Sequence, residues 1–138
     1  MADIFRPART GPAAVLGPLE GAIMEIVWRG GAAMPVPEVH RALVEQGRNI
    51  SYSAVKAVLN NLAAKGRLEK SRAGKGTRFA ATASRDAFEA EVVATVVASL
   101  KRNFGRAAIA QLVDELVVDQ ESLEEFERMI AQRKSELE

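Results

Sequence analysis

The chain has 138 residues and a nearly neutral balance of 19 Lys plus Arg against 18 Asp plus Glu. It contains no cysteine, which excludes disulfides, thiolate zinc sites and cysteine redox sensing. His40 is the only histidine, so metal sites built from clustered histidines are excluded and an ordinary helical histidine is expected there.

The first segment, residues 1–15, is expected to be a flexible arm. It contains no apolar run long enough for a signal peptide. The longest apolar stretch of the chain, residues 92–100, is too short to span a bilayer. We therefore expect a cytoplasmic protein without membrane insertion.

Two helices and a short strand are expected next. Pro18 is a favourable first residue for a helix that extends to about Trp28, with apolar residues at helical spacing. Residues 34–36 predict a short strand that pairs with a later hairpin. Pro37 then opens a second helix, which extends through about Gln46.

The helix expected over residues 51–65 has two contrasting faces. Ser51 is a suitable N-cap, and one face carries an apolar stripe formed by Val55, Leu59 and Leu62. The opposite face carries small or hydrogen-bonding side chains, and no acidic residue occurs over residues 46–68. Such a face suits contact with phosphates and base edges, and a solvated face short of Glu is the alternative.

A basic hairpin is expected directly after this helix. Two short extended runs flank a Gly-Lys-Gly tip within residues 68–81, and glycine supplies the positive φ angles of tight turns. The hairpin carries Lys70, Arg72, Lys75 and Arg78. A helix with an acid-free polar face followed by a basic hairpin is the layout of a winged helix-turn-helix. In that layout the helix enters the major groove of DNA, and the wing lies on the DNA backbone or in the minor groove.

From residue 84 the pattern changes to long amphipathic helices, the first over about residues 84–103. Their apolar stripes have too few partners within the chain to cover them all. This surplus indicates a homodimer, and folding back on the front half is the alternative. The residues expected in the dimer interface are Phe88, Val92, Val96, Leu100, Phe104, Leu112, Leu116, Phe126 and Ile130.

The balance of charge also changes at about residue 84. Residues 1–83 carry 12 Lys plus Arg against 6 Asp plus Glu, whereas residues 84–138 carry 7 against 12. The two halves are therefore expected to meet different partners. We predict a winged-helix DNA-binding domain over residues 16–83 and a helical dimerisation domain over residues 84–138.

Over about residues 16–117 the sequence resembles the penicillinase-repressor (BlaI/MecI) family. The matching motifs are Leu16-Gly17-x-Leu19-Glu20-x-x-Ile23-Met24-x-x-x-Trp28 and Tyr52-Ser53-x-Val55-x-x-Val58-Leu59-x-x-Leu62-x-x-Lys65-Gly66. The resemblance implies a dimeric repressor that binds inverted-repeat operators and dimerises through C-terminal helices. It also implies a membrane sensor protease system as a partner, because such a system inactivates many members of the family.

Several positions depart from the family pattern. Asn61 stands where the family usually has Arg, and Ala54 and Ala57 stand where Thr is common, so a different base preference is expected. The family's cleaved Asn-Phe bond would fall near residues 114–115, which are Asp-Glu, whereas the Asn-Phe pair at 103–104 comes too early. This mismatch argues against control by that protease. The cysteines of the copper-responsive branch are absent.

We therefore predict a mainly α protein with a small β-wing, acting as a homodimeric repressor on double-stranded operator DNA, without a cofactor, a metal or catalytic residues. Ser53, Lys56 and Asn60 are expected to read base edges. The full set of expected DNA contacts is Ser51, Tyr52, Ser53, Lys56, Asn60, Asn61, Arg72, Lys75 and Arg78. A winged-helix adaptor for protein interactions is the alternative function.

Overall fold

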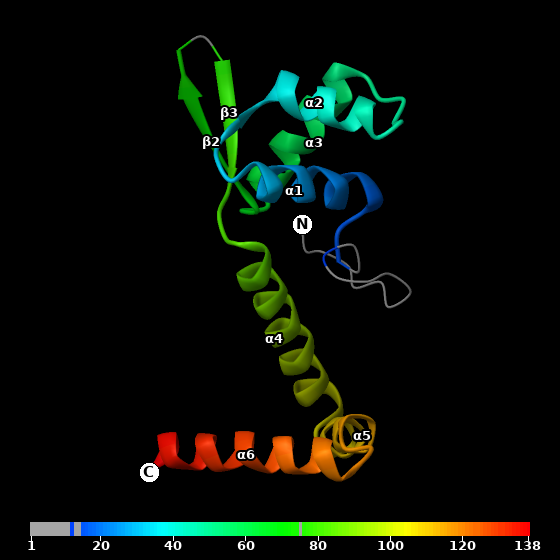
Figure 1. Cartoon of the computed structure of the whole chain (residues 1–138), viewed down its shortest axis with the longest axis vertical. Helices are drawn as coiled ribbons and strands as arrows, with labels where there is room; N and C mark the ends of the chain where they lie inside the picture. Colours follow the sequence, from blue (N-terminus) through cyan, green and yellow to red (C-terminus); the bar gives the residue numbers. More distant parts are fainter. Residues whose placement is uncertain (1–11, 13–14, 75) are drawn as a thin grey trace. The chain divides into compact units, whose positions relative to one another are not determined.

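A computed structural model describes residues 12, 15–74 and 76–138. Within these residues the chain forms two compact units, which divide between Val92 and Val93. The first unit contains helices α1 to α3, a small sheet and the start of α4, and the second contains the rest of α4 with α5 and α6 (Figure 1). The fold is mainly α with a small β-wing, as predicted. Apart from Pro12 and Val15, the arm predicted over residues 1–15 lies outside the described residues.

Three helices build most of the first unit: α1 (Pro18–Gly30), α2 (Val36–Glu45) and α3 (Tyr52–Ala64). A proline in the first turn of α1 and of α2 suits a position whose backbone N–H has no helical partner. The chain leaves α1 through Gly31, whose φ of 69° lies in the left-handed region that favours glycine. The predicted helices are confirmed, with their ends displaced by one or two residues.

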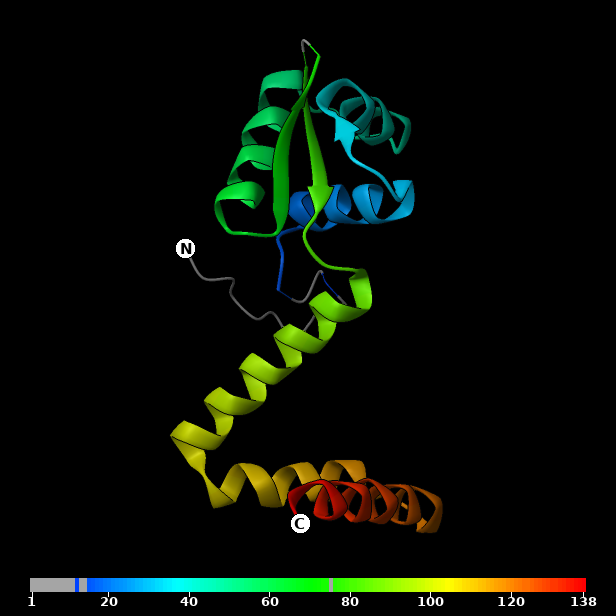
Figure 2. The ribbon, with the colours of Figure 1, turned by 90° about the vertical axis from the view of Figure 1, so that its left-hand side faces the viewer.

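The sheet has three antiparallel strands, β1 (Met34–Pro35), β2 (Leu68–Ala73) and β3 (Gly76–Ala81), in the order β1-β3-β2. Met34 pairs with Phe79, so the short strand before α2 lies along the hairpin as predicted. Figure 2 shows α3, in green, alongside the β2–β3 hairpin. This arrangement is that of a winged helix.

The core of the first unit is apolar and draws on every one of its helices. Phe79 of β3 is fully buried in this core, and the helices contribute their predicted stripes, among them Ile23, Val39, Leu43, Val55, Leu59 and Leu62. Burying a side chain of this size stabilises the fold by about 1.5–3 kcal/mol. The core therefore fixes α3 by one face and leaves its opposite face exposed.

The first two turns of α4 (Arg85–Phe104) belong to this core. Phe88 is only 3% exposed, and its ring centroid lies 5.5 Å from that of Trp28. The Nε1 of Trp28 donates to the carbonyl oxygen of Ala83 at 3.0 Å, and Val92 packs against the same core. The prediction that Phe88 lies in a dimer interface is therefore corrected, because its ring is already covered by its own chain.

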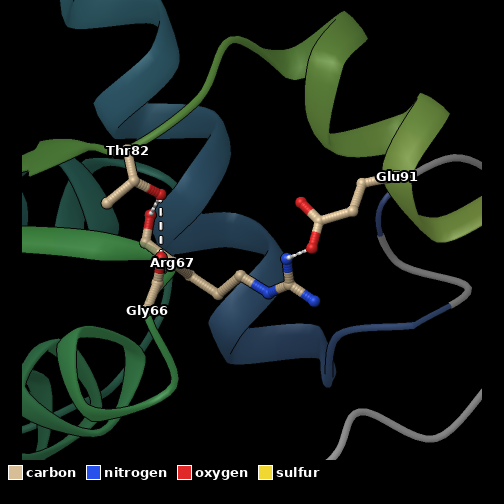
Figure 3. Close-up of polar contacts among 4 residues, drawn as sticks. All are labelled: Gly66, Arg67, Thr82 and Glu91. Atoms are coloured by element: carbon tan, nitrogen blue, oxygen red, sulfur yellow. Dashed lines mark hydrogen bonds and ion pairs between the residues drawn. The ribbon is translucent and has the colours of Figure 1, made fainter.

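Arg67 links the base of the wing to the same turns of α4. Its guanidinium carbon lies 4.7 Å from the Phe88 ring centroid, and its Nη1 donates to Glu91 Oε1 at 3.4 Å (Figure 3). The hydroxyl of Thr82 donates to the carbonyl oxygens of Gly66 and Arg67, at 2.8 and 3.2 Å. These bonds join the two ends of the hairpin just before α4 begins.

The second unit consists of α4 beyond Val92, α5 (Arg106–Leu116) and α6 (Gln120–Leu137). Gly105 separates α4 from α5 with a φ of 53°. Asp119 caps α6 by accepting from the backbone N–H of Ser122 at 2.8 Å. None of residues 93–138, all of which the structure describes, is buried. A helical unit of this kind has apolar side chains but no core of its own.

No helix in the described part of the chain is both long enough and apolar enough to cross a membrane.

Candidate nucleic-acid interface

The N-terminus of α3 is held in place by its own cap and by α2. Ser51 Oγ accepts from the backbone N–H of Ala54 at 3.2 Å, which satisfies one of the unpaired donors of the first turn. His40 Nε2 donates to the carbonyl oxygen of Ile50 at 2.9 Å, and the His40 ring meets Tyr52 edge-on at 5.9 Å between centroids. His40 therefore has a structural role, and Ser51 and Tyr52 are fixed before any ligand arrives.

The outward face of α3 is exposed at Ser53, Lys56 and Ala57. Ser53 Oγ lies 3.4 Å from Ser51 Oγ. Ser53 and Ala57 are small and allow the helix backbone to approach a partner closely, and the ammonium of Lys56 is the one charge of the three. Because no acidic residue occurs over residues 46–68, no carboxylate of this segment opposes an approaching phosphate.

Asn60 belongs to the same helix but both atoms of its amide are engaged. Its Nδ2 donates to the carbonyl oxygen of Lys56 at 3.0 Å, and its Oδ1 accepts from Lys70 Nζ at 2.9 Å. Asn60 thus joins α3 to strand β2 of the wing.

Asn61 is engaged on the side of α3 that meets α1. Its Nδ2 donates to Glu20 Oε1 at 3.1 Å, and Lys65 Nζ donates to Glu20 Oε2 at 2.9 Å. The Lys65 and Glu20 side chains are 12% and 18% exposed. Asn61 is itself exposed, and its amide nitrogen is bound to α1. Glu20 was not among the predicted site residues, although it lies in the first turn of a predicted helix.

The basic side chains of the wing divide between the two faces of the hairpin. Successive residues of a strand point to opposite faces, and directly paired residues share one. Lys70 pairs with Phe79 and Arg72 pairs with Thr77, so Lys70 and Arg72 lie on the face that carries the buried Phe79. Arg78 pairs with Ser71 on the other face.

The face that carries Phe79 is also the face toward α3, as the contact between Lys70 and Asn60 shows. Beginning at buried Leu68, Lys70 and Arg72 step along this face toward the hairpin tip. We call Lys70 and Arg72 the inner basic pair. Lys70 was left out of the predicted DNA contacts, although alternation counted from Leu68 would have placed it beside Arg72. Lys75, another predicted contact, lies outside the described residues.

Most of the predicted dimerisation residues lie in the second unit and keep apolar surface exposed. Phe104 is 65% exposed, Leu116 55% and Ile130 46%, whereas Val96, Leu100, Leu112 and Phe126 are half-buried. An open apolar pocket of about 270 Å³ lies between the end of α4 and α5, lined in part by Leu100, Phe104 and Leu112. The structure brings these three residues together around one cavity.

Among the described residues, no group of three or more His, Asp or Glu side chains is placed to hold a metal ion.

Comparison with known proteins identifies the family of this chain. The penicillinase repressor family model matches residues 16–132. Two curated relatives, the transcriptional regulators BlaI of Mycobacterium tuberculosis strains CDC 1551 and H37Rv, are each 30% identical over 106 residues, which is 76% of this chain and 76% of theirs.

Among solved structures, H. salinarum RosR is similar with a TM-score of 0.46 at 20% identity, over 89% of this chain and 97% of that chain.

Proposed function

The chain belongs to the penicillinase repressor family of winged-helix transcriptional regulators, which are not enzymes, and we propose that it is a homodimeric repressor of an inverted-repeat operator. One observation carries the DNA-binding part of this proposal. The acid-free outward face of α3 and the inner basic pair lie on adjoining surfaces of one unit. That surface has the charge and the slim side chains that a DNA groove requires.

In the proposed complex α3 enters the major groove and β2 follows the sugar-phosphate backbone. Ser53 and Lys56 meet base edges, since both are exposed on the outward face. Lys70 and Arg72 meet phosphates, because they lie on the face of the wing that adjoins α3. Arg78, on the other face, contributes less than the sequence pattern predicted.

The second part of the proposal is that residues 93–138 associate with the same residues of a second copy. None of these residues is buried, and apolar side chains such as Phe104, Leu116 and Ile130 stay largely hydrated in a single copy. A second copy would cover the pocket formed by Leu100, Phe104 and Leu112, together with Leu116 and Ile130. Two identical heads would then occupy half-sites about 34 Å apart, and the operator would be blocked by occupancy.

The experiment is a titration of fluorescent duplex DNA with the full chain at several salt concentrations. A protein that neutralises about 8 phosphates should lose affinity with a log-log slope of roughly −7 against salt. Replacing Arg72 with Glu should weaken binding to every duplex, and Arg78→Glu, with the same charge change, should weaken it less. Binding that ignores salt and Arg72→Glu would instead favour a protein-interaction adaptor.

A further inference from the structure

We infer that Asn60 is a positioning residue for the wing and not a reader of bases, and that it holds Lys70 beside α3 as an additional phosphate contact. The inference rests on the proposed function and deepens it. It starts from the two hydrogen bonds that Asn60 makes with Lys56 and Lys70. An exposed helical Asn facing DNA is otherwise an obvious partner for adenine.

The two bonds fix the orientation of the Asn60 amide. An ammonium only donates, so Lys70 requires the oxygen of the amide, and a carbonyl only accepts, so the Lys56 backbone requires the nitrogen. Exchanging the two atoms would break both bonds at once. Pairing with adenine needs the same nitrogen and the same oxygen. Each atom can form one further hydrogen bond, but the present partners fix the plane of the amide, so Asn60 could turn toward a base only by leaving both of them.

Lys70 lies where its ammonium can contact a phosphate of the DNA. Lys70 lies between buried Leu68 and exposed Arg72 on the face of β2 that adjoins α3. Its bond to Asn60 draws the ammonium to the polar face of α3, where Lys56 already carries a positive charge. A positive charge held between α3 and β2 meets the DNA backbone that borders the groove entered by α3. Base reading then falls to Ser53 and Lys56.

A double-mutant cycle on DNA affinity tests the inference. Asn60→Ala, Lys70→Ala and the double variant are titrated against a duplex selected from a random-sequence library and against a scrambled duplex of the same composition. Lys70→Ala should weaken both complexes about 5- to 10-fold and reduce the salt slope by about 1. Asn60→Ala should weaken both complexes several-fold in the wild-type background and should have no further effect once Lys70 is replaced. All variants are first shown to unfold cooperatively in urea.

Base preference gives the second readout, with Ser53→Ala as the matched control on the same face. Random-library selection with Asn60→Ala should recover the wild-type sequence preference, whereas Ser53→Ala should relax it at one base pair per half-site. The inference is overturned if Asn60→Ala relaxes the preference at one position, or if it weakens binding equally with and without Lys70. In either case wild-type binding to DNA would leave the proposed function standing. A wild-type protein that binds no duplex would overturn both.

Discussion

Lys65, the C-cap of α3, donates to Glu20 of α1 across 2.9 Å, and both side chains are largely shielded from water. The second oxygen of the same carboxylate accepts from Asn61. One acidic residue in the first turn of α1 therefore binds two polar side chains one helical turn apart, Asn61 near the end of α3 and Lys65 at its C-cap. This contact joins the C-terminal end of α3 to α1, in addition to the apolar packing of Val55, Leu59 and Leu62.

Replacing Glu20 with Ala should lower the free energy of unfolding by about 1–3 kcal/mol, since it leaves the shielded Lys65 ammonium and Asn61 without this acceptor. Urea denaturation followed by circular dichroism measures the change. Glu25→Ala is the matched control, because it removes an equally short pair with the more exposed Arg85 and should cost less. Equal losses for the two variants would show that Glu20 has no special role.

Replacing Trp28 with Phe should cost about 0.5–1.5 kcal/mol, because the hydrogen bond to the Ala83 carbonyl is lost while a ring still faces Phe88. Trp28→Ala should cost more, since it also removes the packing that holds the start of α4. Trp28 is the only tryptophan, so unfolding is followed by circular dichroism in place of fluorescence. If Phe and Ala cost the same, the ring contact contributes nothing.

The proposed dimer predicts a mass near twice the 14.9 kDa of one chain in light scattering. Phe104→Glu should shift the mass toward that of one chain, because a carboxylate would be buried without a partner in the apolar interface. Asn103→Glu introduces the same charge at the neighbouring exposed position and should leave the dimer intact. A dimer that survives Phe104→Glu would place the interface elsewhere.

Acid should loosen the start of α6. Hydrogen bonds from the backbone and side chain of Ser122 lower the pKa of the Asp119 carboxyl below its ordinary value. Because the pKa is lower in the folded state, the cap stabilises α6 at pH values above the unfolded pKa, and this stabilisation is lost as pH falls through the folded pKa. NMR titration of the Ser122 amide should therefore show a midpoint below the ordinary pKa of an Asp carboxyl. A midpoint at or above that value would contradict the cap, and Asp119→Ala should abolish the transition.

The sequence predicted most of the first unit because its signals are local. The stripe of Val55, Leu59 and Leu62 is a helical period, and the Gly-Lys-Gly tip is a turn signal, so α3 and the wing followed directly. Phe88 was misassigned for the opposite reason. It continues the apolar period of α4, and only the fold shows that Trp28 and Arg67, distant in sequence, cover it.

The candidate site was predicted in composition more than in geometry. Counting basic residues on the hairpin treated Arg72 and Arg78 alike, whereas the strand register sends them to opposite faces. Asn60 binds a residue of β2 and Asn61 binds a residue of α1. Both partners lie in other elements of the fold, so no local pattern predicts them. A residue type suited to base reading therefore does not establish that its atoms are available for it.

The most direct test of the proposed repressor is selection of bound duplexes from a random-sequence library, followed by the mass of the complex on the recovered sequence. The proposal predicts one half-site repeated in inverted orientation, with centres about 34 Å apart along the duplex, and two chains bound per duplex. A single unrepeated site occupied by one chain, or no enrichment of any sequence, would contradict it.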